Sequence, residues 1–369
     1  MRQMSSRGRI ETTLSRIPRS PAMGIAILLG LAAPLFFFRL GVPALLDPDE
    51  PYYAVPALEM LRSGSWMVPL LHGQAWFDKP ILFYWIVLAA YRLIGVSEFA
   101  ARIGSALAAT GGVLAVFLSH RRWRPGPLTA LTAAVILASS IEYALIARAA
   151  ITDMTLTLFM TLGMLAMACC LKSGRGLHAG LAGCAFGLAT LAKGPVGLIL
   201  PGVALLLYAV LARRADMFRP KTLGAVAAGT LLSAGPWYAY MVLSHRDLLM
   251  QTFLGDENLG RFLRPEHASF PFYYAVILAL GLLPWSAGLP AALARAFERA
   301  RCADERGGGR EPGTLYALCW FAAVVGVFWL SASKLPSYIL PAFRPAALLL
   351  AGYWTDSLRS RRNDIGAAL

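Results

Sequence analysis

The chain is 369 residues long, 57% of its residues are hydrophobic and only 15% are charged, and its formal net charge at pH 7 is +14. This composition excludes a soluble globular protein, which needs far more charge to cover its surface. It predicts an all-α polytopic membrane protein. Each remaining charged residue then needs its own explanation, because charges are costly inside a membrane.

Ten apolar segments, each close to the roughly 20 residues that a spanning helix needs, are predicted to cross the membrane. They cover residues 22–40, 99–119, 128–146, 154–171, 177–193, 196–212, 222–243, 273–294, 313–330 and 338–354. A further apolar segment, 81–96, is shorter and contains Tyr84, Trp85, Tyr91 and Arg92. Aromatic and basic residues of this kind are typical of a helix that lies at the membrane surface. We therefore predict about ten spans with helices beside the membrane.

The charges of the loops decide whether segment 81–96 spans the membrane. If it does not, the segments on one side hold 22 of the 34 Lys and Arg residues and eight of the 20 acids, a net charge of +14. The other side then holds 12 basic and 12 acidic residues, which cancel. This asymmetry is what the positive-inside rule expects of cytoplasmic loops. The excess of basic residues is therefore explained by the orientation of the chain in the membrane and by contact with anionic lipids. No nucleic-acid partner is expected.

The same topology predicts the organisation of the whole chain. Residues 1–21 form a basic cytoplasmic N-terminus, residues 22–354 a membrane domain, and residues 355–369 a cytoplasmic tail without a soluble C-terminal domain. Loops 41–98 and 244–272 lie on the outer side of the membrane, and the first of them is expected to carry the chemistry.

The first outer loop concentrates acids and a cation in two short runs. Asp47, Asp49 and Glu50 lie near its start, and Asp78 and Lys79 lie near its middle. Acids that accept a proton or bind a metal, next to cations that hold a phosphate, suit group transfer from a lipid-linked phosphate donor. The alternative for Asp47 and Asp49 is to cap a helix that begins near residue 51, and we expect Asp47 to be such a cap.

A series of short motifs runs in order through most of residues 20–354. It includes Asp-Glu-Pro-Tyr-Tyr at 49–53, Phe-Asp-Lys-Pro at 77–80, the segment 148–153, Leu-Ala-Lys-Gly at 191–194 and Lys-Leu-Pro-Ser-Tyr-Ile-Leu-Pro at 334–341. These motifs resemble those of the bacterial aminoarabinose transferases that act on lipid A, and of the related protein O-mannosyltransferases. Both are GT-C glycosyltransferases that use polyprenyl-phosphate sugars. The resemblance implies a GT-C helical bundle with periplasmic juxtamembrane helices.

The resemblance also implies roles for the acids. Asp49 matches the acid that acts as general base or organises the acceptor, Glu50 lies beside it, and Asp153 matches a second acidic position. Asp78 stands where the aminoarabinose transferases have a glutamate linked to metal binding, and His267 is the best imidazole on the outer side. Asp78 and His267 are therefore the candidate ligands of a divalent metal ion, which is the one cofactor expected.

The cations that match the family's pattern are expected to bind the phosphate of the donor. They are Lys79, Arg148, Lys193 and Lys334. Structural alternatives stay open for each: Lys79 could extend to the lipid headgroups, Arg148 could form a salt bridge with Asp153, and Lys193 and Lys334 could anchor helix ends at the interface.

The predicted function is that of an integral-membrane glycosyltransferase. It would transfer a hexosyl or pentosyl group from an undecaprenyl-phosphate sugar, or another polyprenyl-phosphate sugar, with inversion at the anomeric carbon. The acceptor would be lipid A, a glycan or a protein hydroxyl on the periplasmic side of the bacterial inner membrane. One alternative is a transporter or flippase of a lipid-linked sugar, for which Glu142 and Arg344 near mid-membrane are the signals. Another is a shortened, catalytically inactive homologue, because such relatives usually continue with more spans and an outer domain.

Overall fold

The structure is a computed structural model that describes residues 21–120, 127–263, 270–305 and 312–367. In these residues the fold is almost entirely helical, apart from a small antiparallel hairpin of strands β1 (Leu70–Leu71) and β2 (Gln74–Ala75). The prediction of an all-α fold is therefore confirmed.

Each predicted span corresponds to one helix or to two or three consecutive helices. The helices in chain order are α2 (Pro21–Ala32), η1 (Ala33–Phe37), α5 (Glu98–His120), α6 (Pro127–Ser139), α7 (Ile141–Ala147), α8 (Thr152–Ser173), α9 (Gly176–Lys193), α10 (Val196–Leu211), α11 (Pro220–Ser244), α13 (Tyr273–Gly281), η4 (Ser286–Gly288), α14 (Leu289–Glu305), α15 (Pro312–Leu330), η5 (Pro336–Ala342) and α16 (Phe343–Ala367). Three helices, within 98–119, 152–173 and 313–330, are long and apolar enough to cross a membrane, and α6 with α7 makes a fourth if that pair is one span.

Two of the predicted spans are broken by identifiable residues. Helices α6 and α7 meet at an angle of 65°, because Ser140 between them adopts an extended backbone conformation. Helices α13 and α14 are separated near Pro284, which lacks a backbone N–H and disfavours helical geometry in the residue before it. Helix α16 continues past residue 354, so the segment predicted to be a tail begins inside a helix.

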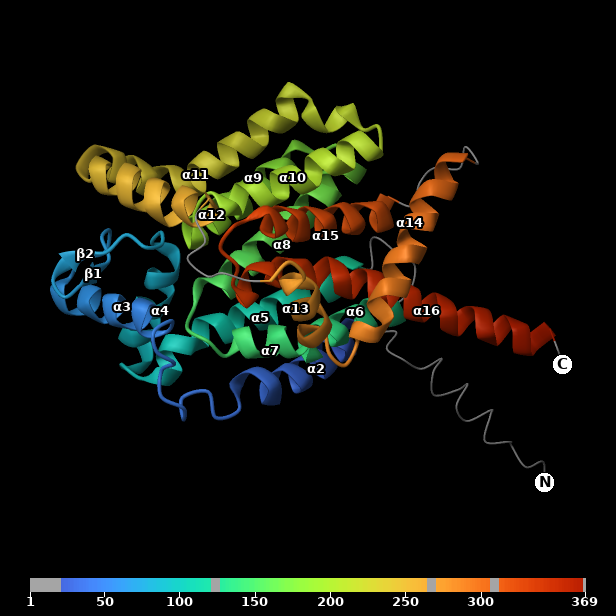
Figure 1. Cartoon of the computed structure of the whole chain (residues 1–369), viewed down its shortest axis with the longest axis horizontal. Coiled ribbons are helices and arrows are strands. Elements are labelled where there is room, and N and C mark those ends of the chain that lie inside the picture. Colours follow the sequence, from blue (N-terminus) through green and yellow to red (C-terminus); the bar gives the residue numbers. More distant parts are fainter. Residues whose placement is uncertain (1–20, 121–126, 264–269, 306–311, 368–369) are drawn as a thin grey trace.

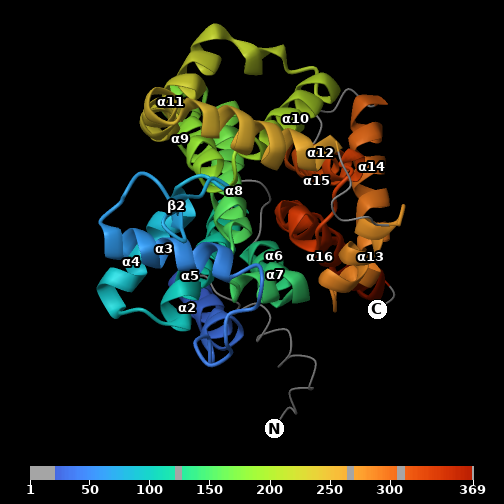
Figure 2. The same cartoon turned by 60° about the vertical axis from the view of Figure 1, so that its left-hand side comes forward.

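The contact between α9 and α11 depends on glycine. A Cβ atom at Gly183 would lie 2.1 Å from the carbonyl oxygen of Val226, and one at Gly229 would lie 2.2 Å from that of Gly180. Small residues of this kind let two membrane helices approach closely, and the resulting van der Waals contact stabilises the pair. Helix α9 also packs against α8, so α9 lies between two neighbours in the bundle (Figures 1 and 2).

A small lobe, defined here as residues 51–94, covers one end of the bundle (Figure 1). It consists of α3 (Pro51–Ser63), the β1–β2 hairpin and α4 (Leu82–Ile94), and it shares a hydrophobic core with α9 and α11. The Trp237 indole in α11 donates a hydrogen bond of 3.0 Å to the Met67 carbonyl oxygen. The short helix η2 (Ala215–Phe218) precedes α11 in the chain. Helices η3 (Leu248–Gly260) and α12 (Arg261–Leu263) follow α11.

Candidate active site

A buried ion pair joins α8 and α9 at the lobe end of the bundle. Asp153 lies in the first turn of α8 and is 5% exposed, and its carboxylate accepts a hydrogen bond from Lys193 in the last turn of α9. An acid at a helix N-terminus and a cation at a C-terminus both interact favourably with the helix dipoles. The Lys193 amine also lies 4.6 Å from the ring centre of Tyr338 in η5. The alternative pairing of Asp153 with Arg148 is therefore wrong.

A second pair lies on the lobe side of the same region. The Lys79 amine donates to the carboxylate of Asp78 at 2.8 Å and to its carbonyl oxygen at 3.0 Å. Lys79 is 9% exposed, so its amine does not extend to open headgroups as an anchoring lysine would. The charges of both residues act on Lys193. The two lysines and their acids therefore belong to one cluster.

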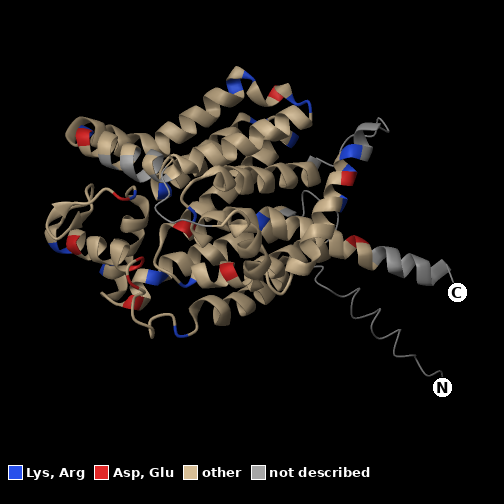
Figure 3. Ribbon diagram, viewed as in Figure 1, with Lys and Arg blue, Asp and Glu red and all other residues tan. Residues whose placement is uncertain are grey.

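Tyr53 in α3 adjoins this cluster from the lobe. Burial, followed by the negative charges of Asp78 and Asp153, raises the pKa of its hydroxyl well above the usual value for tyrosine. The tyrosine thus stays neutral and able to donate a hydrogen bond. We define the cluster of Tyr53, Asp78, Lys79, Asp153 and Lys193 as the charged cluster. Figure 3 shows where the acids and cations of the described residues lie along the ribbon.

Glu50 is buried and has no free acceptor position. Its carboxylate accepts hydrogen bonds from the Arg102 guanidinium at 2.7 and 2.6 Å, and from the backbone N–H groups of Leu46 and Ala150 at 2.7 Å each. Burial alone would raise its pKa, but the bonds from Arg102, Leu46 and Ala150 and the charge of Arg102 outweigh burial and lower the pKa. A carboxylate with about four acceptor sites, all in use, is poorly placed to take a proton from a substrate. The geometry gives Glu50 a positioning role.

Arg102 is the functional residue for which the sequence analysis offered no role. Besides its two bonds to Glu50, it donates to the carbonyl oxygens of Leu40 at 3.0 Å, Pro43 at 2.7 Å and Ala44 at 2.8 Å. All five of its N–H groups then have acceptors. Arg102 thus holds the whole first run of the loop against α5. The signal that could have found it is a cation inside a predicted span, where charge is expensive without a partner.

Asp49 is exposed although Glu50 beside it is buried. Helix α3 begins at Pro51, and its N-cap residue is Glu50, which makes no side-chain capping bond. Asp47 is also exposed and lies three residues before the N-cap, so the prediction that Asp47 caps this helix is wrong. Within the described ranges, the Asp49 side chain has no hydrogen-bond or ion-pair partner. Its carboxylate is accessible to a substrate.

Arg148 and Lys334 lie outside the charged cluster. The Arg148 guanidinium donates to the carbonyl oxygens of Phe38 at 2.9 Å and Leu35 at 3.4 Å, and so fixes the end of the first apolar segment. The Lys334 amine donates to the Ser331 carbonyl oxygen, and Lys334 lies four residues before Tyr338, the ring next to Lys193. Lys334 is therefore close in sequence to Tyr338, whose ring lies next to Lys193. Arg148 instead fixes the segment that leads into the loop with Asp49.

The candidate metal ligands do not form a site in the described residues. No group of three or more His, Cys, Asp or Glu side chains able to hold a metal ion occurs among them. One carboxylate oxygen of Asp78 is held by Lys79, and His267 lies outside the described residues. The divalent metal ion therefore stays a prediction, and no step of the chemistry is assigned to it.

Arg344, one of the two residues that suggested a transport path, is fully buried in α16. It donates to the Tyr143 hydroxyl at 3.1 Å, while its Nε and Nη1 atoms have no hydrogen-bond partner in the part of the chain described. Glu142, the other residue, packs against the position of Gly281. An enclosed guanidinium does not line a water-filled path, so this geometry does not favour a transporter.

The motifs and the geometry agree with comparisons to known proteins. The family model for dolichyl-phosphate-mannose-protein mannosyltransferases matches residues 23–249. The chain is 34% identical over 316 residues to the undecaprenyl phosphate-alpha-4-amino-4-deoxy-L-arabinose arabinosyl transferase of Edwardsiella ictaluri, covering 84% of this chain and 55% of that protein. It is 34% identical over 337 residues to the Erwinia tasmaniensis enzyme of the same name, covering 88% of this chain and 58% of that protein.

Solved structures agree with these sequence matches. The crystal structure of ArnT from Cupriavidus metallidurans bound to undecaprenyl phosphate superposes with a TM-score of 0.79 at 26% identity, covering 90% of this chain and 60% of that chain. The chain thus spans somewhat more than half the length of these relatives. It is a multi-pass membrane protein with a GT-C fold, and it belongs to the dolichyl-phosphate-mannose-protein mannosyltransferase family of membrane glycosyltransferases.

Proposed function

We propose that this protein transfers a glycosyl group from a polyprenyl-phosphate sugar to a hydroxyl group of a cell-envelope acceptor such as lipid A, a glycan or a protein. The observation that carries the proposal is the charged cluster, in which the buried ion pairs Lys79–Asp78 and Lys193–Asp153 interact electrostatically with each other. A solved relative with the same fold is bound to undecaprenyl phosphate, and this supports the donor class.

The chemistry is a direct displacement at the anomeric carbon. The acceptor oxygen forms a bond to that carbon while the bond from carbon to the phosphate oxygen breaks, so the configuration inverts. The acceptor proton passes to Asp49, whose exposed carboxylate can reach a substrate. The leaving phosphate gains negative charge, and Lys79 and Lys193 stabilise that charge in a site largely shielded from water.

The remaining groups of the site hold these residues in place. Glu50 binds Arg102 and the backbone of Ala150, three residues before Asp153, so the loop that carries Asp49 is linked to the start of α8. Asp153 and Asp78 orient the two ammonium groups. Such positioning lowers the entropic cost of bringing donor, acceptor and base together.

The location proposed for the site is the periplasmic face of the bacterial inner membrane. The support is the charge asymmetry of the loops, which places the loop with Asp49 and Lys79 on the outer side and the N-terminus in the cytoplasm. Single cysteines at position 66 and at position 175 test this orientation with a membrane-impermeant thiol reagent in intact cells. Labelling at position 66 alone supports the proposal, and labelling at position 175 alone contradicts it.

The decisive experiment measures sugar transfer by the purified chain. Radiolabelled polyprenyl-phosphate sugars and total envelope lipid are supplied, and Asp49→Asn and Lys79→Ala are compared with the unaltered protein. Asp47→Asn is the matched control, because it removes an exposed acid from the same loop. We expect transfer to fall about 100-fold or more in Asp49→Asn and Lys79→Ala, and to stay unchanged in the control. Full activity in Asp49→Asn would remove that residue from the mechanism, and donor binding without any transfer by the unaltered chain would favour a flippase.

A further inference from the structure

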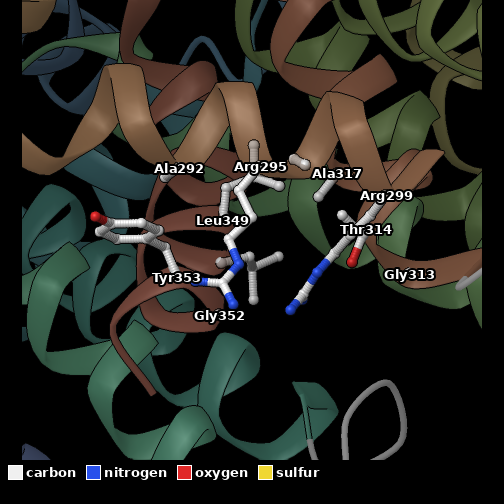
Figure 4. A pocket seen from close by; sticks show the side chains of 11 residues that line it. Ala292, Arg295, Arg299, Gly313, Thr314, Ala317, Leu349, Gly352 and Tyr353 are labelled. Carbon is white, nitrogen blue, oxygen red and sulfur yellow. The ribbon is translucent and has the colours of Figure 1, made fainter. Parts of the chain in front are cut away.

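A second polar site lies at the end of the bundle opposite the lobe. It is an open pocket between α14, α15 and α16 (Figure 4). Helix α15 runs from this pocket, near Thr314, toward Lys334. Its 19 residues span about 28 Å at 1.5 Å per residue. The pocket and Lys334 therefore lie near opposite ends of α15.

Two arginines of one helix supply the charge of this pocket. Arg295 and Arg299 are four residues apart in α14, so their side chains leave the helix on the same face, as Figure 4 shows. Arg299 forms a salt bridge of 2.7 Å with Asp356 in α16. Arg295 contacts only the Ser357 hydroxyl among the groups described, at 3.5 Å, which is the outer limit of a hydrogen bond. These three charged groups leave one positive charge in excess.

The opposite wall of the pocket is apolar. Leu348, Leu349 and Ala317 line it, together with the Tyr353 ring. A site with a cationic end and an apolar wall matches a molecule with an anionic head and a hydrocarbon tail. A buried free anion would instead need polar groups on all sides.

We propose that this pocket binds the phosphate of an anionic membrane phospholipid, with the headgroup at Arg295 and Arg299 and the start of an acyl chain against Leu348 and Leu349. Basic pockets between membrane helices bind such headgroups in other proteins. Arg295 provides the uncompensated charge, and Arg299, held by Asp356, is already oriented toward the same space. The site is separate from the charged cluster and does not depend on the glycosyl-transfer chemistry.

Native mass spectrometry of the full chain in a neutral detergent tests this proposal. Phosphatidylglycerol is compared with phosphatidylcholine of the same chain length, and inorganic phosphate is the third ligand. We expect phosphatidylglycerol to be retained preferentially, and Arg295→Gln to weaken its binding about fivefold, which corresponds to one cation near an anionic lipid. Arg295→Lys should keep most of the affinity because it keeps the charge.

The matched control is Arg175→Gln, which removes an exposed cation from the turn between α8 and α9 at the same end of the bundle. Unchanged binding in this control, with weaker binding in Arg295→Gln, supports the pocket. Equal weakening in both variants would show nonspecific attraction and overturn the proposal. Equal retention of phosphatidylglycerol and phosphatidylcholine would overturn it as well. Binding of inorganic phosphate without any binding of phosphatidylglycerol would also overturn it. Thermal unfolding of each variant confirms that it is folded.

Discussion

Two buried ion pairs near the lobe differ in how completely their groups are satisfied. In the Glu50–Arg102 pair, four acceptor sites and five donors are all used within the protein. In the Asp153–Lys193 pair, one carboxylate oxygen binds the amine, and that amine also faces the Tyr338 ring and the charges of Asp78 and Lys79. A saturated pair can only support structure, whereas an ammonium group beside other charges can also bind an incoming phosphate.

The largest expected effect comes from breaking the saturated pair. Arg102→Gln leaves the Glu50 carboxylate buried without its cation, and an uncompensated buried charge costs about 3–5 kcal/mol of stability. We expect a large drop in the thermal unfolding temperature in detergent. Arg62→Gln, which removes an exposed cation of the lobe, is the control. Similar unfolding temperatures for the two variants would contradict the structural role of the pair.

The open pair should respond mainly in activity. Lys193→Gln removes one group that stabilises the leaving phosphate, and losing one such donor typically costs about 100- to 1,000-fold in rate. The measurement is sugar transfer at saturating donor, together with thermal unfolding. Arg92→Gln, at an exposed cation of the lobe, should leave the rate unchanged. A Lys193→Gln variant that unfolds like Arg102→Gln would show that the two pairs do not differ.

A second buried arginine extends the contrast. Among the described residues, Arg344 makes one hydrogen bond, to Tyr143. Its guanidinium fills the space next to Gly112, where a Cβ atom would lie 1.8 Å from Nη2. Gly112→Ala therefore forces Arg344 to move, and overpacking of this kind costs about 1–3 kcal/mol. Gly111→Ala on the same helix is the control, because its Cβ would lie 3.6 Å from its nearest neighbour, an ordinary contact. Equal unfolding temperatures for the two variants would show that Arg344 is free to move.

The smallest expected effect is on pH dependence. Because the pKa of Glu50 is lower in the folded protein than in the unfolded chain, its contribution to stability is present above the unfolded pKa and is lost as the pH falls through the folded pKa. Thermal unfolding measured from neutral to acidic pH should therefore show a loss of stability that Glu50→Gln lacks. Parallel profiles for both proteins would contradict the lowered pKa.

The prediction from sequence was most reliable where one local property decides the outcome. Hydropathy predicted the order of the helices, and segment 81–96 forms the short helix α4, whose location beside the membrane stays a prediction. The prediction was weaker at chain breaks such as Ser140, because an extended backbone at a serine depends on the packing around it. It was wrong about Asp47, because the actual helix start depends on how the loop is held by Arg102.

Sequence alone therefore determined the class of protein, the family and the end of the bundle where the charges gather, since composition, motif order and charge counts are properties of the chain itself. The tertiary structure decided which of two neighbouring acids, Asp49 and Glu50, is exposed and which is saturated. It also decided that Asp153 pairs with Lys193. These outcomes depend on contacts between residues 40 to 100 positions apart, and only the packing of α5, α8 and α9 brings such residues within hydrogen-bonding distance.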